Sequence, residues 1–460
     1  MAVTEAAQRT TVHGRFLDRG TFVPIRTRVT SLRMDGGPPG DGVVCGEGTV
    51  DGRRVFWFEQ DPTVLGGSLG EAHAGSICRI LDLAGRWGAP VVGVHRSGGA
   101  RIQEGVAALA GYARIFARHV ALRDKVPQLA LVFGPCAGGA AYGPALMDFV
   151  LMSRTGAYMF LTGPDVVREV TGEEVTFDEL GGVRVASRSG LASLVGEDED
   201  GTLEAARRLL AYLPQRIGAA RVTGGWSPPC ADPGRHVPSD PKATYDVRDV
   251  VRGVVDADSM LELRADDAPN LVVALATLEG RTIGVVANQP RHLAGSIDID
   301  ASRKGAWFVG LCDRFRFPLA VLVDTPGFLP GTSQELKGVI PAGASFLAAF
   351  AGATVPKATV VLRKAYGGAY IVMNARDLGA DYAFAWPGAE IAVLGARGAV
   401  RILERKRLAS APDPEALRAE LEERYREEHL SPWPAARAGF IDEVIEPGHT
   451  RDRLIRALCV

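Results

Sequence analysis

The sequence has little of what would suggest binding to nucleic acid or to a membrane. Its 52 lysines and arginines are balanced by 54 acidic residues, which gives a net charge of −2 and does not favour a polyanionic partner. No apolar run reaches the roughly 18 residues that a membrane-spanning helix needs. The first residues also lack the basic and then apolar pattern of a signal peptide. We therefore expect a cytoplasmic protein that binds neither nucleic acid nor membrane.

The six cysteines are scattered, and no two have CxxC spacing. This excludes a zinc ribbon or a thioredoxin-type redox motif, and isolated thiols are typical of a reducing compartment. Cys136 stands in a glycine-rich segment. We interpret it as a small buried residue rather than a nucleophile, because no base lies near it in the sequence. We expect no metal in this chain.

The common catalytic motifs are also missing. There is no GxGxxG, no GxxxxGK[ST] and no GxSxG elbow around Ser97, which argues against nucleotide hydrolysis and serine hydrolysis. His73, His95 and His292 lie near glycine turns, and we interpret each as a loop or packing residue. A chain that lacks recognisable acid–base constellations but is rich in glycine turns favours stabilisation of an oxyanion or enolate, with the proton acceptor supplied by a substrate or cofactor.

The segment at 134–146, GPCAGGAAYGPAL, is the most informative feature that is present. It follows an apolar run at 129–133 that predicts a buried strand. Glycine lets the backbone approach another group closely, and a helix that starts with small residues exposes free N–H groups. Such a turn can bind a phosphate or an oxyanion. Taken alone, it could equally be a strand–helix junction where small residues ease packing.

Strand and helix patterns alternate along the 460 residues, which predicts an α/β layer fold. A proline-rich stretch at 214–244 is expected to connect two domains, at 1–228 and 245–460. We predict a hairpin at Asp51-Gly52. The predicted strands are 91–94, 129–133, 157–161, 283–287, 319–323 and 359–362, and the predicted helices end near 87 or span 103–123, 203–212, 300–314 and 413–428.

The second half repeats the glycine turns of the first. Gly67-Ser68 and Gly99 recur at one identical offset as Gly295-Ser296 and Gly327, and the triplet at 138–140 recurs as 367–369 at nearly the same offset. Three turns in nearly constant register indicate an internal duplication. Two backbone N–H turns of one design suggest that two carbonyl groups are polarised in one reaction.

At this point the sequence resembles a known family, the carboxyltransferase (β) subunits of biotin-dependent acyl-CoA carboxylases of the propionyl-CoA and acetyl-CoA type. The matching strings run in family order from about residue 40 to 453. They include GGSLGEAHA, SGGARIQEGV, GPCAGGAAYGPALMDF, LAGSIDIDAS, DTPGFLPGTSQE, RKAYGGAY and AWPGAEIAVLGA.

The resemblance implies an α/β fold of two tandem crotonase-like domains. It places the acyl-CoA in the first domain and carboxybiotin in the second domain of a partner subunit. Gly138 and Gly139 would form the oxyanion hole for the thioester, and Gly368 and Ala369 the hole for the biotin ureido oxygen. Biotin released from CO₂ would take the α-proton before the enolate attacks. The further substrate-binding residues that the motifs imply are Ser97, Gly98, Gly99, Ala100, Arg101, Ala137, Tyr142, Gly327, Phe328, Tyr366, Gly367 and Ile371.

The resemblance also implies partners. The chain has no Met-Lys-Met attachment site, so biotin would be supplied in trans by a biotin carboxyl carrier protein, with a biotin carboxylase (α) subunit to carboxylate it. A homodimer, or a hexamer built as a trimer of dimers, is expected.

Several positions differ from the family pattern. Arg96 stands where Asp or Asn is usual, Pro341-Ala342 stands for Arg-His, Ala186 stands near a missing histidine, and Ile371 stands where propionyl-preferring enzymes tend to have Asp. These differences leave two alternatives open. One is a biotin-independent decarboxylase, or a related enzyme acting on a malonyl-type CoA or carrier-protein thioester. The other is a scaffold subunit that pairs with an active paralogue.

Overall fold

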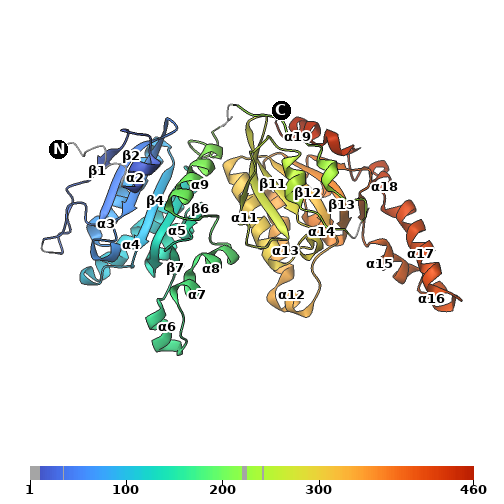
Figure 1. Cartoon of the computed structure of the whole chain (residues 1–460), viewed down its shortest axis with the longest axis horizontal. Helices are drawn as coiled ribbons and strands as arrows, with labels where there is room; N and C mark the ends of the chain where they lie inside the picture. The colour runs from blue at the N-terminus through green and yellow to red at the C-terminus, as the bar shows by residue number, and fades with distance from the viewer. Residues whose placement is uncertain (1–10, 35, 220–224, 230, 241–242, 460) are drawn as a thin grey trace. The chain divides into compact units, whose positions relative to one another are not determined.

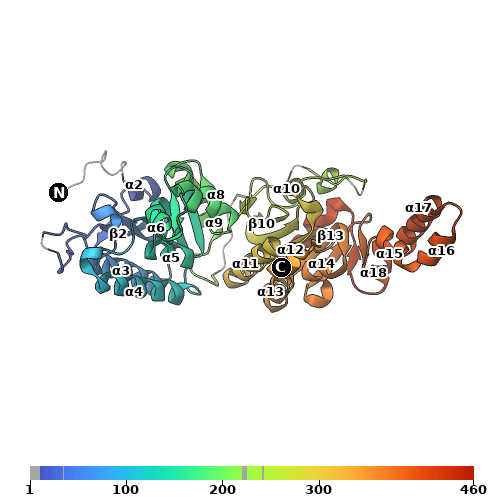
Figure 2. The ribbon, with the colours of Figure 1, turned by 90° about the horizontal axis from the view of Figure 1, so that it is seen from below.

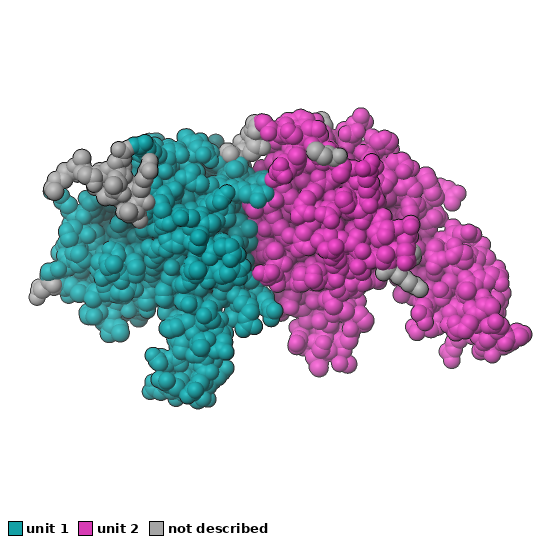
Figure 3. Space-filling view, viewed as in Figure 1, with its two compact units in different colours: residues 1–220 teal, residues 221–460 magenta. Residues whose placement is uncertain are grey.

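The computed structural model describes residues 11–34, 36–219, 225–229, 231–240 and 243–459. These residues form two compact units, unit 1 within residues 1–220 and unit 2 within 221–460 (Figure 3). The expected connecting segment at 214–244 spans this division. Gly224 and Pro241, on which parts of that expectation rest, lie outside the described residues, as do Cys230 and the first ten residues.

Unit 1 is built on one eight-stranded sheet in the order β1-β2-β3-β4-β5-β6-β8, with β7 added beside the end of β5 (Figure 1). β2 and β3 form an antiparallel hairpin that turns at Asp51-Gly52, as predicted. From β3 onward all neighbours are parallel, so helices must connect them. The strands are β1 (Val23–Ile25), β2 (Val43–Val50), β3 (Arg53–Gln60), β4 (Val91–Ser97), β5 (Gln128–Ala137), β6 (Phe149–Ser153), β7 (Tyr158–Phe160) and β8 (Leu194–Gly196).

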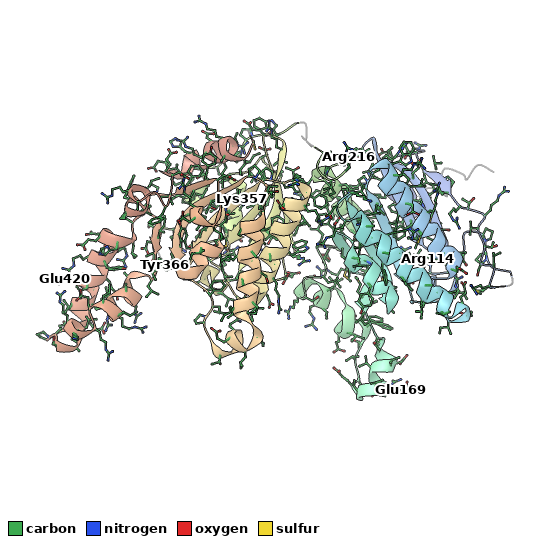
Figure 4. The ribbon with its side chains drawn as sticks, turned by 180° about the vertical axis from the view of Figure 1, so that it is seen from behind. Arg114, Glu169, Arg216, Lys357, Tyr366 and Glu420 are labelled. Carbon is green, nitrogen blue, oxygen red and sulfur yellow. The ribbon has the colours of Figure 1, made fainter. Side chains whose placement is uncertain are left out.

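The helices of unit 1 bury one face against this sheet. In α3, the apolar residues Ile77, Ile80, Leu81 and Ala84 recur at helical spacing and are all buried. The short helices α6 and α7 instead project away from the sheet, with Glu169 on α6 far out on this projection (Figure 4). The helices are α2 (Val12–Phe16), α3 (Glu71–Trp87), α4 (Val106–Leu122), α5 (Gly139–Leu146), α6 (Pro164–Thr171), α7 (Phe177–Gly181), α8 (Val183–Arg188) and α9 (Glu199–Tyr212).

Unit 2 repeats this sheet strand for strand. Its order is β9-β10-β11-β12-β13-β14-β16, with β15 beside the end of β13. The strands β10 and β11 form the antiparallel hairpin, β9 pairs antiparallel with β10, and from β11 onward all neighbours are parallel. The strands are β9 (Leu261–Leu263), β10 (Leu271–Leu278), β11 (Arg281–Asn288), β12 (Leu319–Thr325), β13 (Lys357–Tyr366), β14 (Tyr382–Ala385), β15 (Glu390–Ala392) and β16 (Glu443–Val444).

The helices of unit 2 include a charged arm, α15 to α17, that extends from the sheet (Figure 2). The arm has a small core of its own, Val400, Leu408 and Leu421. The predicted charged helix at 413–428 is α17, which continues at its end as a π-helical turn at 426–430. The helices are α10 (Val247–Arg252), α11 (Ile299–Phe315), α12 (Thr332–Lys337), α13 (Val339–Gly352), α14 (Gly367–Val372), α15 (Ala396–Leu403), α16 (Arg405–Ser410), α17 (Pro414–Tyr425), α18 (Pro432–Arg437) and α19 (Thr450–Leu458).

The two units confirm the internal duplication in their fine geometry. The β4–β5 pairing shifts register between His95 and Ser97, and the β12–β13 pairing shifts between the equivalent positions, Val323 and Thr325. An isolated bridge joins Leu69 to Ala100, and its equivalent joins Ile297 to Phe328. A left-handed turn, with positive φ at three successive residues, spans 65–67 in unit 1 and 293–295 in unit 2.

Some elements were not predicted. The strand β10 and the helix α13 are almost continuously apolar, and such runs have no periodicity that distinguishes strand from helix. The predicted strands at 129–133 and 359–362 are cores of longer strands that extend into the glycine turns. Among the described residues, we find no helix with the length and apolar character needed to cross a bilayer.

Candidate functional site

In each unit the glycine turn lies where two parallel strands end side by side. Ser97 at the end of β4 pairs with Cys136 in β5, and Thr325 at the end of β12 pairs with Ala365 in β13. The loop after one strand therefore faces the turn after the next. A Cβ on Gly99 would lie 3.1 Å from the carbonyl oxygen of Ala137. The carboxyl ends of parallel strands are where α/β folds bind their ligands.

The first turn presents its N–H groups at the start of α5. Gly138 has a φ of 57°, and its N–H donates to the carbonyl oxygen of Phe160 at 3.1 Å. The N–H of Ala141 donates to the carbonyl of Gly138. The N–H groups between them, those of Gly139 and Ala140, belong to the first helical turn, which has no intrahelical acceptors. The sequence predicted Gly138 and Gly139 as the two N–H donors of the oxyanion hole. The geometry favours Gly139 and Ala140 instead, so only Gly139 belongs to both pairs.

A tyrosine that the sequence did not single out connects this turn to the neighbouring loop. The ring of Tyr112 would lie 3.1 Å from a Cβ on Gly139. Its hydroxyl lies 3.5 Å from Ser97 Oγ, which accepts the N–H of Gly99. Burial raises the pKa of Tyr112 to about 12. Tyr112 sits at an ordinary buried position of α4, so spacing alone would have suggested only core packing.

Arg101 is buried and its charge is already neutralised. The guanidinium lies 2.6 Å from Asp41 Oδ1 and 2.8 Å from Glu104 Oε1, with all three side chains at most 1% exposed. It also donates to the carbonyl of Ser68 at 3.0 Å. Arg101 therefore stabilises the loop that carries Gly98 to Ala100.

Arg96, which differs from the family pattern, points elsewhere. Its guanidinium pairs with Glu199 at the start of α9 and lies over the ring of Phe133. Glu199 also pairs with Arg15 of α2. A Cβ on Gly134 would come within 3.3 Å of the Arg96 Cβ, so glycine provides the room that the arginine needs. The substitution is accommodated by an ion-pair network joining α2, β4 and α9.

The remaining predicted residues of unit 1 surround the first turn. Gly98 is exposed and donates its N–H to the carbonyl of Gly66. Ala100 bridges to Leu69, and Ala137 is half-buried beside the turn. Tyr142 is half exposed, with its ring against Phe116.

The second turn opens into an apolar cavity of about 570 Å³. Three predicted residues, Phe328, Gly368 and Ile371, lie together in its lining. Gly368 and Ile371 are exposed, and Ala369 is buried directly behind them. Gly327, Gly367, Ala369 and Tyr366 are not part of the lining. The lining is Phe328, Leu329, Pro330, Glu335, Val339, Ile340, Gly343, Ala344, Leu347, Gly368, Ile371 and Val372.

Gly327 and Gly367 shape the loops around this cavity. Gly327 has a φ of 140° and accepts the N–H of Ile297, and Gly367 has a φ of 58° at the start of α14. The side chain of Tyr366 turns away from the cavity, and its hydroxyl donates to Glu390 on β15. The carboxylate of Glu390 also lies 3.4 Å from Arg426 at the end of α17. Tyr366 thus links the second turn to the charged arm.

Pro341 and Ala342, the second difference from the family pattern, fit the packing of α13. Pro341 is in the first turn of the helix, where its missing N–H leaves no hydrogen bond unmade. Ala342 is buried in a small cluster with Ile299 and Val339, against which Phe328 packs. This cluster supports one wall of the cavity.

The histidines near the first turn are buried and neutral. Burial lowers the pKa of His73 and of His95 to about 3, and that of His119 to about 4. Cys136 is fully buried, as predicted, and burial raises the pKa of its thiol to about 12. His292 is exposed. Across the described residues there is no cluster of three or more His, Cys, Asp or Glu side chains able to hold a metal ion.

Known proteins are similar in sequence to this chain along nearly its whole length. The family model of the carboxyl transferase domain matches residues 6–460. The carboxyltransferase subunit of propionyl-CoA carboxylase from Haloferax mediterranei is 51% identical over 453 residues, covering 96% of this chain and 88% of the relative. The methylmalonyl-CoA decarboxylase subunit alpha of Propionigenium modestum is 44% identical over 454 residues, covering 96% and 87%.

A solved structure agrees. Transcarboxylase 12S, described as a hexamer with methylmalonyl-coenzyme A and methylmalonic acid bound, has a TM-score of 0.91 and 46% identity, and the match covers 97% of this chain and 87% of that one. The predicted fold, two tandem crotonase-like domains, and the predicted class of activity, carboxyl transfer with an acyl-CoA, are both confirmed. The chain belongs to the carboxyl transferase domain family, in the branch of the carboxyltransferase subunits of acyl-CoA carboxylases.

Proposed function

We propose that the chain transfers a carboxyl group from biotin on a separate carrier protein to the α-carbon of a short acyl-CoA, with unit 1 serving the thioester and unit 2 the biotin. The observation that carries this proposal is the repeated turn. In each unit two adjacent parallel strands end side by side, and a glycine-rich helix begins directly after the second of them. A reaction between two carbonyl compounds needs two such sites.

In unit 1 the chain's own task is to hold the thioester oxygen and stabilise its negative charge as the α-proton leaves. The N–H groups of Gly139 and Ala140 supply the donors, aided by the positive end of the α5 dipole. Tyr112 and Ser97 keep the turn and the loop at 97–101 in register. Gly138 makes the sharp bend, since its φ of 57° suits only a residue without a Cβ.

No histidine near the first turn is suited to remove the proton. His73, His95 and His119 are buried, and their lowered pKa values make them weak bases at neutral pH. Biotin, when bound, supplies the carboxyl group and the proton acceptor. The residues of the chain then bind and orient the two substrates and exclude water.

The cavity of unit 2 is suited to a bicyclic, mostly apolar group with one carbonyl. Apart from Glu335 its walls are apolar, and the exposed backbone of Gly368 lies within its lining. The N–H groups of Gly368 and Ala369, at the start of α14, are the candidate donors to the ureido oxygen. Ile371 adds a branched apolar side chain to the same lining.

We also propose that the active form is a homodimer or a hexamer built as a trimer of dimers, in which unit 2 of a partner copy completes each site. The related 12S structure is a hexamer. Ile340 in the lining of the cavity is 72% exposed and Leu336, one residue after Glu335 of the same lining, is 88% exposed, so a partner copy could cover both apolar side chains.

The test is to mix the purified chain with a carboxylated biotin carrier and, in turn, acetyl-, propionyl- and butyryl-CoA. Mass spectrometry should detect the malonyl-, methylmalonyl- or ethylmalonyl-type product only when the carrier is present. No product with any of the three thioesters would overturn the proposal.

A second candidate is decarboxylation of a malonyl-type thioester without biotin, and a relative named as a decarboxylase subunit keeps it open. Arg96 and Pro341-Ala342 first suggested it, yet both are accounted for by packing. Incubation of the chain alone with methylmalonyl-CoA distinguishes the two functions. Release of CO₂ without biotin would favour the decarboxylase.

A further inference from the structure

A buried ion pair lies directly behind the second turn. Asp324, at the end of β12, is 1% exposed, and its Oδ2 accepts from Arg363 Nε at 3.0 Å and from the Tyr245 hydroxyl at 2.9 Å. Its Oδ1 accepts the backbone N–H of Lys364 at 3.3 Å. Burial raises the pKa of Asp324, and the three donors that converge on its carboxylate oppose this effect of burial.

The same arginine holds a third segment. Arg363 Nη1 donates to the carbonyl oxygens of Asp240 and Ala243, at 3.2 and 2.8 Å. The cluster, defined here as Tyr245, Asp324 and Arg363, therefore ties the end of β12, the last part of β13 and the segment before α10 together. Removing one partner of such a buried pair leaves an uncompensated charge.

Both walls of the cavity begin at this cluster. Phe328 follows Asp324 by four residues, and Gly368 follows Arg363 by five. A Cβ on Gly368 would lie 3.9 Å from the ring of Phe328, so these two residues face each other at the cavity. A small rotation of β12 against β13 would change the distance between them.

Among the described residues of unit 1, no equivalent cluster lies at the first turn. The positions that correspond to Asp324 and Arg363 are Arg96 and Gly134, and Arg96 pairs outward with Glu199 of α9. The duplication thus offers Arg96 as a matched control for the cluster. It occupies the position in unit 1 that Asp324 occupies in unit 2, but its ion pair is with α9 and not with the strand beside it.

We infer that the Tyr245–Asp324–Arg363 cluster positions the two walls of the unit 2 cavity, and that it governs binding of the biotin-side substrate without affecting the acyl-CoA side. This inference rests on the proposed function of unit 2. The three residues are positioning residues, since none of them lines the cavity.

The experiment measures carboxyl transfer from methylmalonyl-CoA to free biotin by the full chain. Tyr245→Phe removes one hydrogen bond to a charged group, and we expect a rise of about tenfold in KM for biotin with KM for methylmalonyl-CoA within about twofold. Arg363→Gln combined with Asp324→Asn should give a larger rise in the same direction. Arg96→Gln, the control, should leave KM for biotin unchanged.

A second measurement is independent of activity. Amide hydrogen exchange in residues 364–372 should be faster in Tyr245→Phe than in the wild type, while exchange in residues 134–142 stays the same. Equal changes in both KM values, or no change in exchange at 364–372, would overturn the inference. If the wild type transfers no carboxyl group to biotin, either free or on the carrier protein, the proposed function fails, and the exchange measurement alone decides the positioning role.

Discussion

Unit 1 and unit 2 have the same strand order, the same register shift and the same bridge, yet they place different chemistry at equivalent positions. Arg101 in unit 1 is the centre of a buried ion-pair network, while its counterpart Leu329 lines an apolar cavity. Arg96 pairs outward with α9, while its counterpart Asp324 pairs inward with Arg363. The backbone path is what both copies retain, and the side chains around it differ.

The units also differ in their response to acid. His73, His95 and His119 are buried in unit 1, whereas the described histidines of unit 2, namely His236, His292, His429 and His449, are half-buried or exposed. A buried neutral histidine binds a proton more weakly in the folded than in the unfolded state. This difference in histidine burial predicts that the two units lose stability at different pH.

The largest expected effect is loss of unit 1 stability in acid. An unfolded histidine has a pKa of about 6.5, and the folded values are about 3 to 4. Between these values the unfolded state binds more protons, so the free energy of unfolding falls as pH falls, by up to about 1.4 kcal/mol per histidine per pH unit. Hydrogen exchange from pH 7 to 4.5 should show protection lost in unit 1 first. Loss in unit 2 first would contradict the buried neutral state.

The next effect concerns Arg101. Arg101→Leu leaves Asp41 and Glu104 buried without a cation, and we expect the free energy of unfolding of unit 1 to fall by about 3–5 kcal/mol. Urea denaturation followed by hydrogen exchange in each unit measures it. Leu329→Met, a volume-conserving change at the equivalent position, is the control and should cost less than about 1.5 kcal/mol. Equal costs would mean that the ion-pair network does not stabilise unit 1.

Gly368 gives an effect on catalysis rather than on stability. Its backbone φ is not in the left-handed region and a Cβ would lie 3.9 Å from Phe328, so Gly368→Val should fold. The added side chain would block the cavity side of the turn, and we expect kcat/KM for carboxyl transfer to fall by about 10²- to 10³-fold. Gly388→Val, at an open position of the same unit, should leave activity unchanged. Retained activity in Gly368→Val would remove the second turn from the site.

The smallest effect is expected at Arg96. The pair with Glu199 is partly exposed, with side chains 17% and 30% accessible, so Arg96→Gln should lower the free energy of unfolding by only about 0.5–1 kcal/mol. KM for the acyl-CoA should not change. A large change in KM would mean that Arg96 acts at the site and would revive the decarboxylase alternative.

The sequence predicted the parts of the fold that depend on local pattern and on repetition. The Asp51-Gly52 hairpin, the helix ending at Trp87 and the duplication of the glycine turns at a nearly constant offset were all visible in the printed order of residues. The helix α13 was missed because buried apolar runs carry no periodicity. For the site, three of the residues that the motifs imply, Phe328, Gly368 and Ile371, line one cavity, and their role in binding stays a prediction.

What could not be predicted depends on partners distant in the sequence. Nothing local reveals that Arg101 is buried against Asp41, 60 residues away, or that the N–H of Gly138 is used by Phe160. The burial of Tyr112 under Gly139 follows from how α4 packs on α5, which only the fold decides. Such contacts determine which backbone groups of a motif remain free to act.

The left-handed turn at 65–67 and 293–295 shows two different reasons for glycine, namely lack of space for a Cβ and a positive φ. A Cβ on Gly67 or Gly295 would come within 2.4 Å of a carbonyl oxygen, that of Arg96 or Asp324, so no other residue fits. The middle residue has a φ of 63° at Gly66 and 52° at Ala294, where glycine is favoured only by backbone energy of about 1–2 kcal/mol. In unit 2 the middle position holds alanine, whereas the position with the steric requirement holds glycine in both units. The two copies thus differ where only a conformational penalty applies and agree where a Cβ would collide, so positions 66 and 294 are the ones open to redesign.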